Sequence, residues 1–228
     1  MIYVSEKGKR VYLLISVTVF IISCVLYVAK PAVYRILLGN FNPLAVVLLL
    51  AIMGYFLLGS LSSKGFYAYK PVCFSARLPY LGVAVFLGLG MIFVDYIAHL
   101  PEDINILFPH SLLYYPIFGY IVEVLFHMVP LFLVFTIIDH FVELDESRIL
   151  YFLLLVSVLE PVFQLGLGFS FQIPLWTTVY IGLNIFLINL FQLLSYKRLD
   201  FVSMYAFRLT YYLFWHIIWG NLRLRLFF

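Results

Sequence analysis

The stretch SLLYYPIFGYIVEVLFHMVPLFLVFTII, from Ser111 to Ile138, decides the fold class. It exceeds the roughly 20 apolar residues that a helix needs to cross a bilayer. Only Glu123 and His127 within it can carry a charge near neutral pH. Ionisable side chains at membrane depth are costly and usually mark function. The stretch therefore predicts a membrane-spanning helix with a functional site near its middle.

The composition of the whole chain supports the same class. Of its 228 residues, 65% are hydrophobic and 11% are charged, and the mean hydropathy is +1.08. So few charged residues cannot cover a soluble globule. A net charge of +3 without a basic patch excludes a nucleic-acid partner. We therefore predict an all-α, polytopic integral membrane bundle that forms a single domain over residues 1–228, with the lipid bilayer as its surroundings.

Seven apolar spans can be drawn along the chain, each close to the length of a bilayer crossing. They run over Val11–Ala29, Pro43–Leu61, Leu78–Ala98, Ser111–Ile138, Leu150–Leu167, Leu175–Ser195 and Val202–Leu222. The fifth span is short and contains Pro161, and the fourth contains Pro116 and Pro130. Prolines inside these spans predict local helix breaks or kinks.

The positions of lysine and arginine predict the orientation of the spans. If the N-terminus is cytoplasmic, the inner segments carry Lys7, Lys9, Arg10, Lys64, Lys70, Arg77, Arg148, Lys197 and Arg198. The outer segments then carry Lys30, Arg35, Arg223 and Arg225. Because inner loops are enriched in basic residues, this pattern predicts a cytoplasmic N-terminus and an external C-terminus. We expect a bacterial or archaeal plasma membrane.

Glu123 and His127 are spaced by one helical turn, so both side chains project from the same face of the fourth span. They are close enough to share a hydrogen bond or an ion. Pro130 follows within a turn and cannot donate a backbone hydrogen bond. Irregular backbone at membrane depth is tolerated where protein or water surrounds it. The pattern therefore predicts an inward-facing site with a local break beside it.

Two later spans bring further polar residues to a similar depth. Glu160 and Gln164 are one turn apart on the fifth span, and Pro161 predicts a helix break at Glu160. His216 lies on the seventh span, one turn after Tyr212. Because three spans place acids and imidazoles at one level, we expect these side chains to meet inside the bundle.

This set of residues suits the activation of a water molecule. A carboxylate in a dry site can take a proton from water, and a histidine can orient that water or hold a metal. A divalent metal such as zinc is a candidate cofactor, because it binds nitrogen and oxygen ligands. The candidate catalytic residues are Glu123, His127, Glu160, Gln164 and His216. The candidate metal ligands are Glu123, His127, Glu160 and His216.

The segment VEVLFH, from Val122 to His127, resembles the EExxFR motif of the CAAX-protease and bacteriocin-processing intramembrane proteases, the CPBP or Abi family. The EPVFQ and HIIWG segments occupy the places of the family's FxxxH and HxxxN motifs, and the similarity extends over about residues 111–221. Glu123 and His216 match polar positions of the family by identity. The departures from its motifs are Val122, His127, Glu160, Gln164 and Gly220.

The resemblance implies an intramembrane hydrolase, most simply a CAAX-protease-like metalloprotease. Glu123 would act as the general base on water, and His216 would hold the water or stabilise the oxyanion. The substrate would be a peptide or a lipid-linked group that enters laterally from the membrane. Two alternatives stay open. A proton-coupled transporter would use Glu123, His127, Glu160 and His216 as a relay, and a non-catalytic relative would bind a partner or confer immunity.

Other polar side chains in the spans have structural explanations. Asp95 and His99 are one turn apart near the outer end of the third span, which predicts an interfacial structural role. Arg208 lies near the cytoplasmic end of the seventh span, which predicts that it extends to the interface. The amides of the sixth span are expected to hydrogen-bond between helices, and they are Asn184, Asn189 and Gln192.

Overall fold

A computed structural model describes residues 6–101, 104–138, 141, 145–168 and 173–227. All regular structure in these residues is helical, which confirms the all-α prediction. The order is α1 (Glu6–Ala29), a 3-10 turn (Pro31–Tyr34), α2 (Arg35–Leu38), α3 (Pro43–Ser63), α4 (Phe74–Ala98), α5 (Ser111–Val122), a first π segment (Glu123–Met128), α6 (Val129–Ile138), α7 (Glu146–Ser157), α8 (Leu159–Gly168), α9 (Leu175–Arg198), α10 (Phe201–Tyr212), a second π segment (Leu213–Trp219) and α11 (Gly220–Phe227).

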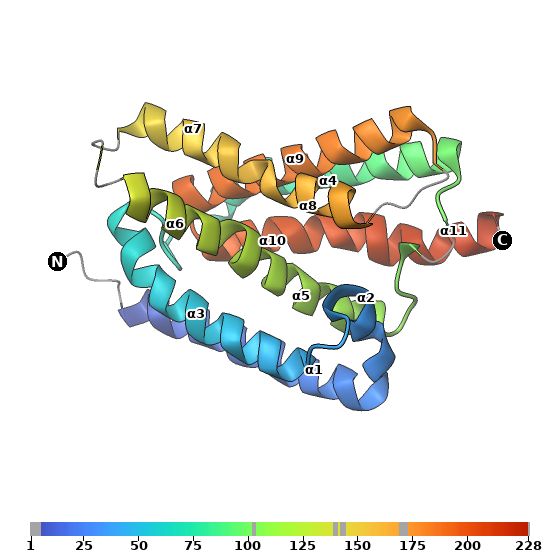
Figure 1. The fold of residues 1–228 in the computed structure, drawn as a ribbon, viewed down its shortest axis with the longest axis horizontal. Coiled ribbons are helices and arrows are strands. Elements are labelled where there is room, and N and C mark those ends of the chain that lie inside the picture. Colours follow the sequence, from blue (N-terminus) through green and yellow to red (C-terminus); the bar gives the residue numbers. More distant parts are fainter. Residues whose placement is uncertain (1–5, 102–103, 139–140, 142–144, 169–172, 228) are drawn as a thin grey trace.

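The helices form an elongated bundle, in which α1 begins near one end and α11 lies at the opposite end (Figure 1). Helix α10 packs against α4, α5 and α9, and α1 packs against α3 and α5. Within the described residues, six helical runs are long and apolar enough to cross a membrane. The last run, from Phe201 to Phe227, is outside those six, and it contains the buried residues Arg208 and Arg223.

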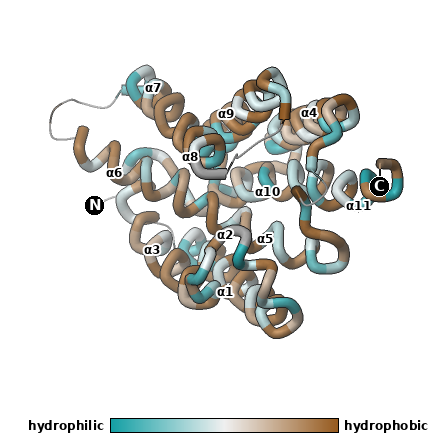
Figure 2. The backbone as a smooth tube through the Cα atoms, turned by 45° about the vertical axis from the view of Figure 1, so that its right-hand side comes forward, coloured by the Kyte–Doolittle hydropathy of each residue, from teal (hydrophilic) through white to brown (hydrophobic). Residues whose placement is uncertain are grey.

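The distribution of side chains is that of an integral membrane protein. Figure 2 shows hydrophobic residues along most of the helices. Large apolar side chains on the outside are highly exposed, with Val28 at 85% and Phe86 at 74%. In contrast, Glu123, Glu160 and Arg208 are buried at 0 to 2% exposure. A lipid environment favours this arrangement, in which apolar residues face outward and polar residues face inward.

The break predicted near Pro130 takes the form of the first π segment. Proline lacks the amide hydrogen that would continue the α-helical pattern. In the structure, the Val129 amide donates to the carbonyl oxygen of Val124, five residues earlier. Such π bulges occur frequently at functional sites. Glu123 and His127 both lie in this segment, and His216 lies in the second π segment.

The break predicted near Glu160 is at Val158, between α7 and α8. Pro161 cannot donate to the carbonyl oxygen of Ser157 four residues earlier. That oxygen instead accepts a hydrogen bond of 3.3 Å from Asn189 Nδ2 on α9. The Asn189 side chain therefore replaces the missing backbone hydrogen bond. Glu160 lies in the first turn of α8, directly after the break.

A buried ion pair closes the bundle at the end of α4. Asp95 is fully buried, and its Oδ1 accepts from the Leu100 amide at 2.9 Å and from Arg223 Nη2 at 3.0 Å. The Trp219 indole donates to Oδ2 at 2.5 Å. Asp95 therefore has a structural role, as predicted, but its charged partner is Arg223. His99 instead ends α4 in the left-handed conformation and packs on Phe227.

Candidate functional site

Glu123 and His127 form the predicted pair. His127 Nδ1 lies 2.5 Å from Glu123 Oε2, and both side chains are fully buried. Each belongs to the first π segment, whose wider turn still places residues four apart on one face. His127 Nε2 is also buried and has no hydrogen-bond partner among the described residues. One ring nitrogen of the pair is therefore buried without a hydrogen-bond partner in the described part of the chain.

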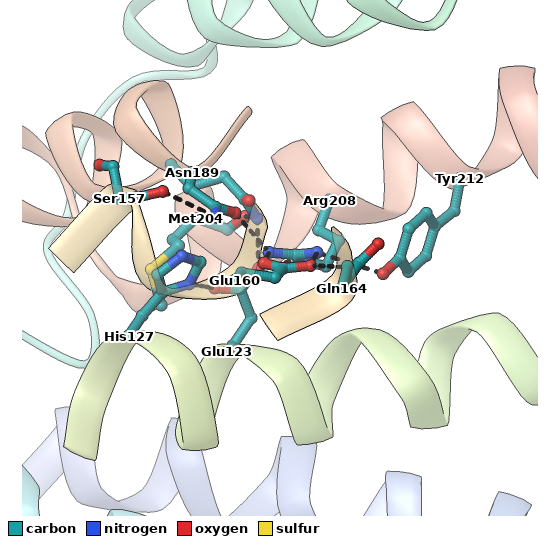
Figure 3. Close-up of polar contacts among 10 residues, drawn as sticks. Glu123, His127, Ser157, Glu160, Gln164, Asn189, Met204, Arg208 and Tyr212 are labelled. Atoms are coloured by element: carbon teal, nitrogen blue, oxygen red, sulfur yellow. Dashed lines mark hydrogen bonds and ion pairs between the residues drawn. The ribbon is translucent and has the colours of Figure 1, made fainter. Parts of the chain in front are cut away.

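Arg208 joins the two glutamates from α10. Its Nε donates to Glu123 Oε1 at 2.7 Å, and its Nη2 donates to Glu160 Oε2 at 2.9 Å (Figure 3). Nη1 donates to Glu160 Oε1 at 3.2 Å, so the contact with Glu160 is bidentate. The guanidinium group thus lies between carboxylates from two different helical runs. The prediction that Arg208 extends to the interface was wrong.

Amide side chains complete this network. Gln164 Nε2 donates to Glu160 Oε1 at 2.8 Å, and Asn189 Oδ1 accepts from Arg208 Nη2 at 3.2 Å. Gln192 Nε2 donates to Glu123 Oε1. The predicted role of the α9 amides between helices is therefore confirmed. Two of them also belong to the charged network, which the sequence did not indicate. We call this set the arginine cluster, and its members are Glu123, His127, Glu160, Gln164, Asn189, Gln192 and Arg208.

The arginine cluster contains more carboxylates than fixed cations. Glu123 and Glu160 together carry two negative charges when ionised, whereas Arg208 carries one positive charge. An unbalanced charge in a dry interior is costly, and the hydrogen bonds that both carboxylates accept reduce this cost.

His216 lies near the arginine cluster, on the wall of a cavity of about 200 Å³. The polar part of this wall consists of Glu160, Gln164, Arg208, Tyr211, Tyr212 and His216, and the rest is apolar. The His216 ring stacks on Tyr115 with a centroid distance of 4.5 Å. Its Nδ1 lies 2.5 Å from Asn105 Oδ1. Contacts from α5 and from the segment before it therefore hold this imidazole in position.

The five predicted site residues fall into two groups. Glu160, Gln164 and His216 line the cavity, as members of α8 and the second π segment. Glu123 and His127 are outside its wall, and they connect to it through Arg208. Sequence reasoning missed Arg208 and Asn105 as site residues. Asn105 gave no signal, because it lies in a connecting segment far from His216 in the chain.

The candidate metal ligands do not form a metal centre. In the described part of the chain, no three histidine, cysteine, aspartate or glutamate side chains lie close enough to hold one ion. One carboxylate oxygen of Glu123 and both of Glu160 accept from the Arg208 guanidinium, whose positive charge disfavours a metal cation there. The residues therefore do not fit a zinc site.

Comparison of the chain with protein-family models, with curated proteins and with solved structures gave no match. What the fold and the site define is a class, an integral membrane bundle with a charged network and a cavity in its interior. The resemblance to the CPBP proteases stays a prediction that rests on the motif around Glu123 and on His216.

Proposed function

We propose that the chain is an intramembrane hydrolase whose reaction takes place in the cavity beside the arginine cluster. The observation that carries the proposal is the setting of His216. Its ring lines the cavity, while its Nδ1 is held by Asn105 Oδ1. Because an amide oxygen only accepts hydrogen bonds, Nδ1 carries the proton of the neutral ring. Nε2 is then the basic nitrogen, which can take a proton from a water molecule.

Tyr212 can supply the complementary hydrogen-bond donor. Its hydroxyl oxygen accepts from Arg208 Nη1 at 3.2 Å, and the side chain lines the same cavity as His216. A cation that donates to a hydroxyl polarises it, so its own O–H becomes a stronger donor. A carbonyl oxygen that gains negative charge during water attack would accept this bond.

The other members of the cluster hold these groups in place. Arg208 uses its five donor positions on Glu123, Glu160, Tyr212 and Asn189, so no guanidinium hydrogen is left for a substrate. Both oxygens of Glu123 are occupied. In this proposal Glu123 positions Arg208, and the role of base passes to His216. The substrate class is a peptide or lipid-linked group that enters from the membrane.

The assignment predicts opposite results for two substitutions. We expect His216→Ala to lower turnover by about 10²- to 10⁴-fold, the usual contribution of a general base. Glu123→Gln should keep most of the turnover, because the amide oxygen still accepts from Arg208. The measurement is the release of a fluorescent fragment from single-span peptides reconstituted with the protein in liposomes.

The control for both variants is Leu213→Ala, since this side chain lies three residues before His216 in the same π segment and is 41% exposed. If Glu123→Gln abolishes cleavage and His216→Ala does not, Glu123 is the base and our assignment of His216 is wrong. If the wild-type protein cleaves none of the peptides or their lipid-linked counterparts, the hydrolase proposal itself fails.

A second candidate function is proton-coupled transport, which the charge balance of the arginine cluster favours. The unpartnered Nε2 of His127 is a place where one proton could bind and leave. In proteoliposomes that contain a pH-sensitive dye, this function predicts proton flux that His127→Gln abolishes and His216→Ala leaves unchanged. Wild-type liposomes with no more flux than empty ones would exclude it.

We propose a cytoplasmic N-terminus for the protein, and Cys73 offers a direct test. Cys73 is exposed in the basic segment between α3 and α4, and a hydrogen bond with Ser75 lowers the pKa of its thiol. A membrane-impermeant maleimide should therefore label Cys73 in inside-out vesicles and leave it unlabelled in intact cells. Cys73→Ser is the control for labelling at Cys24. Labelling of Cys73 in intact cells would reverse the orientation.

A further inference from the structure

A second cavity, of about 570 Å³, lies at the end of the bundle where α3 ends and α7 begins. Its polar wall contains the cationic side chains of Lys70, Lys197 and Arg198, with Glu146 as the acidic residue. These residues are remote from the arginine cluster, and the proposed reaction does not use them. The excess of positive charge indicates a site for an anion.

Two of the three cations of this cavity, Lys70 and Lys197, are held in place by contacts with the protein. Lys197 Nζ donates to the Lys64 carbonyl oxygen at 2.9 Å and lies 3.3 Å from Glu146. Lys70 Nζ lies over the Tyr67 ring, 4.5 Å from its centroid. Burial, and then the nearby charge of Lys197, lower the pKa of Lys70. An anion between the two ammonium groups would relieve this repulsion.

The remaining wall of the cavity includes an apolar part. It is formed by Leu150 and Leu153 of α7 and by Leu194 of α9. Leu150 is 46% exposed on the outer surface of the bundle. A ligand here would place an anionic group against the lysines and a hydrocarbon part along the leucines. Free inorganic phosphate would use only the first of these features, whereas a phospholipid would use both.

We propose that this cavity binds the headgroup of an anionic phospholipid, with the phosphate between Lys70, Lys197 and Arg198 and an acyl chain along α7. Basic pockets between membrane helices on the cytoplasmic side are suited to such headgroups. The sequence pattern places these three residues on that side. Binding of the lipid would connect α7, α9 and the segment that contains Lys70.

The test compares two double variants that remove the same charge from the same end of the protein. Lys70→Gln/Arg198→Gln changes the cavity and keeps Lys197, which also binds the Lys64 carbonyl. Lys7→Gln/Arg10→Gln is the matched control on α1. In native mass spectrometry of the protein in micelles containing phosphatidylglycerol, we expect the cavity variant to bind this lipid about 30-fold more weakly. The control should bind like the wild type, and phosphatidylcholine should not compete.

Three outcomes would overturn the proposal. Equal loss of phosphatidylglycerol in both double variants would indicate general attraction by surface charge. Equal binding of phosphatidylcholine would remove the role of headgroup charge. Displacement of the lipid by sodium phosphate, but not by sodium chloride at equal ionic strength, would assign the cavity to free phosphate. If the double variant does not fold, Arg198→Gln alone, on an exposed side chain, should weaken binding about 5-fold.

Discussion

Arg208→Met is expected to destabilise the protein by about 3–5 kcal/mol, the usual cost of removing one partner from a buried ion pair. Methionine fits the path of the arginine stem but donates no hydrogen bonds. Glu123 and Glu160 would then be buried with unbalanced negative charge. The measurement is reversible unfolding of the purified protein in detergent, followed by helical circular dichroism.

Two further variants separate loss of charge pairing from loss of volume. Arg225→Met, in the same helical run, alters an exposed arginine and should change stability by less than about 0.5 kcal/mol. The triple variant Glu123→Gln/Glu160→Gln/Arg208→Met has no buried charge at these positions. It should recover much of the stability that Arg208→Met loses, because neutral replacement of a whole buried ion cluster is often tolerated. A triple variant as unstable as the single one would contradict this explanation.

Asp95→Ala, at the end of α4, should also destabilise the protein by about 3–5 kcal/mol. It removes the acceptor of the Arg223 guanidinium, the Trp219 indole and the Leu100 amide together. Asp95 thus joins the end of α4 to the second π segment and to α11, so we expect the end of α4 and the start of α11 to lose protection in hydrogen exchange as well.

The control for Asp95→Ala is Glu146→Ala, which breaks an ion pair whose carboxylate side chain is 84% exposed. Exposed pairs contribute about 0–1 kcal/mol, so this variant should unfold close to the wild type. Asp95→Asn keeps the size of the side chain and one acceptor oxygen, and its stability should lie between those of the wild type and Asp95→Ala. Equal stability of Asp95→Ala and the wild type would mean that the Arg223 pair contributes nothing.

The sequence was sufficient to predict the helical architecture, because the thickness of a bilayer sets the length of apolar run that a membrane-spanning helix needs. It was also sufficient for the Glu123 and His127 contact, since one helical turn separates them. Pro130 and Pro161 correctly indicated local breaks, although not that one of them is a π segment, whereas Pro116 lies inside α5 without a break. Each of these features depends on residues close together in the chain.

Contacts between distant segments were harder to predict. Arg208 was assigned to the interface because its position along a single span was the only information, and its partners come from the first π segment and from α8. The same reason hid the pairing of Arg223 with Asp95, which lies 128 positions away in the chain. The stability of a buried charge depends on neighbours that a local pattern does not contain.

The first π segment also affects how this chain would align with relatives. A π turn contains one residue more than the α turn that it replaces, and each added residue rotates the following side chains by about 100° around the axis. A relative with an unbroken α-helix there would match this chain on both sides of the Glu123–Met128 segment only if one residue is left unaligned within it. In such a relative, the number of residues between the positions equivalent to Glu123 and His127 would differ by one, although the residues around these two positions would be the same.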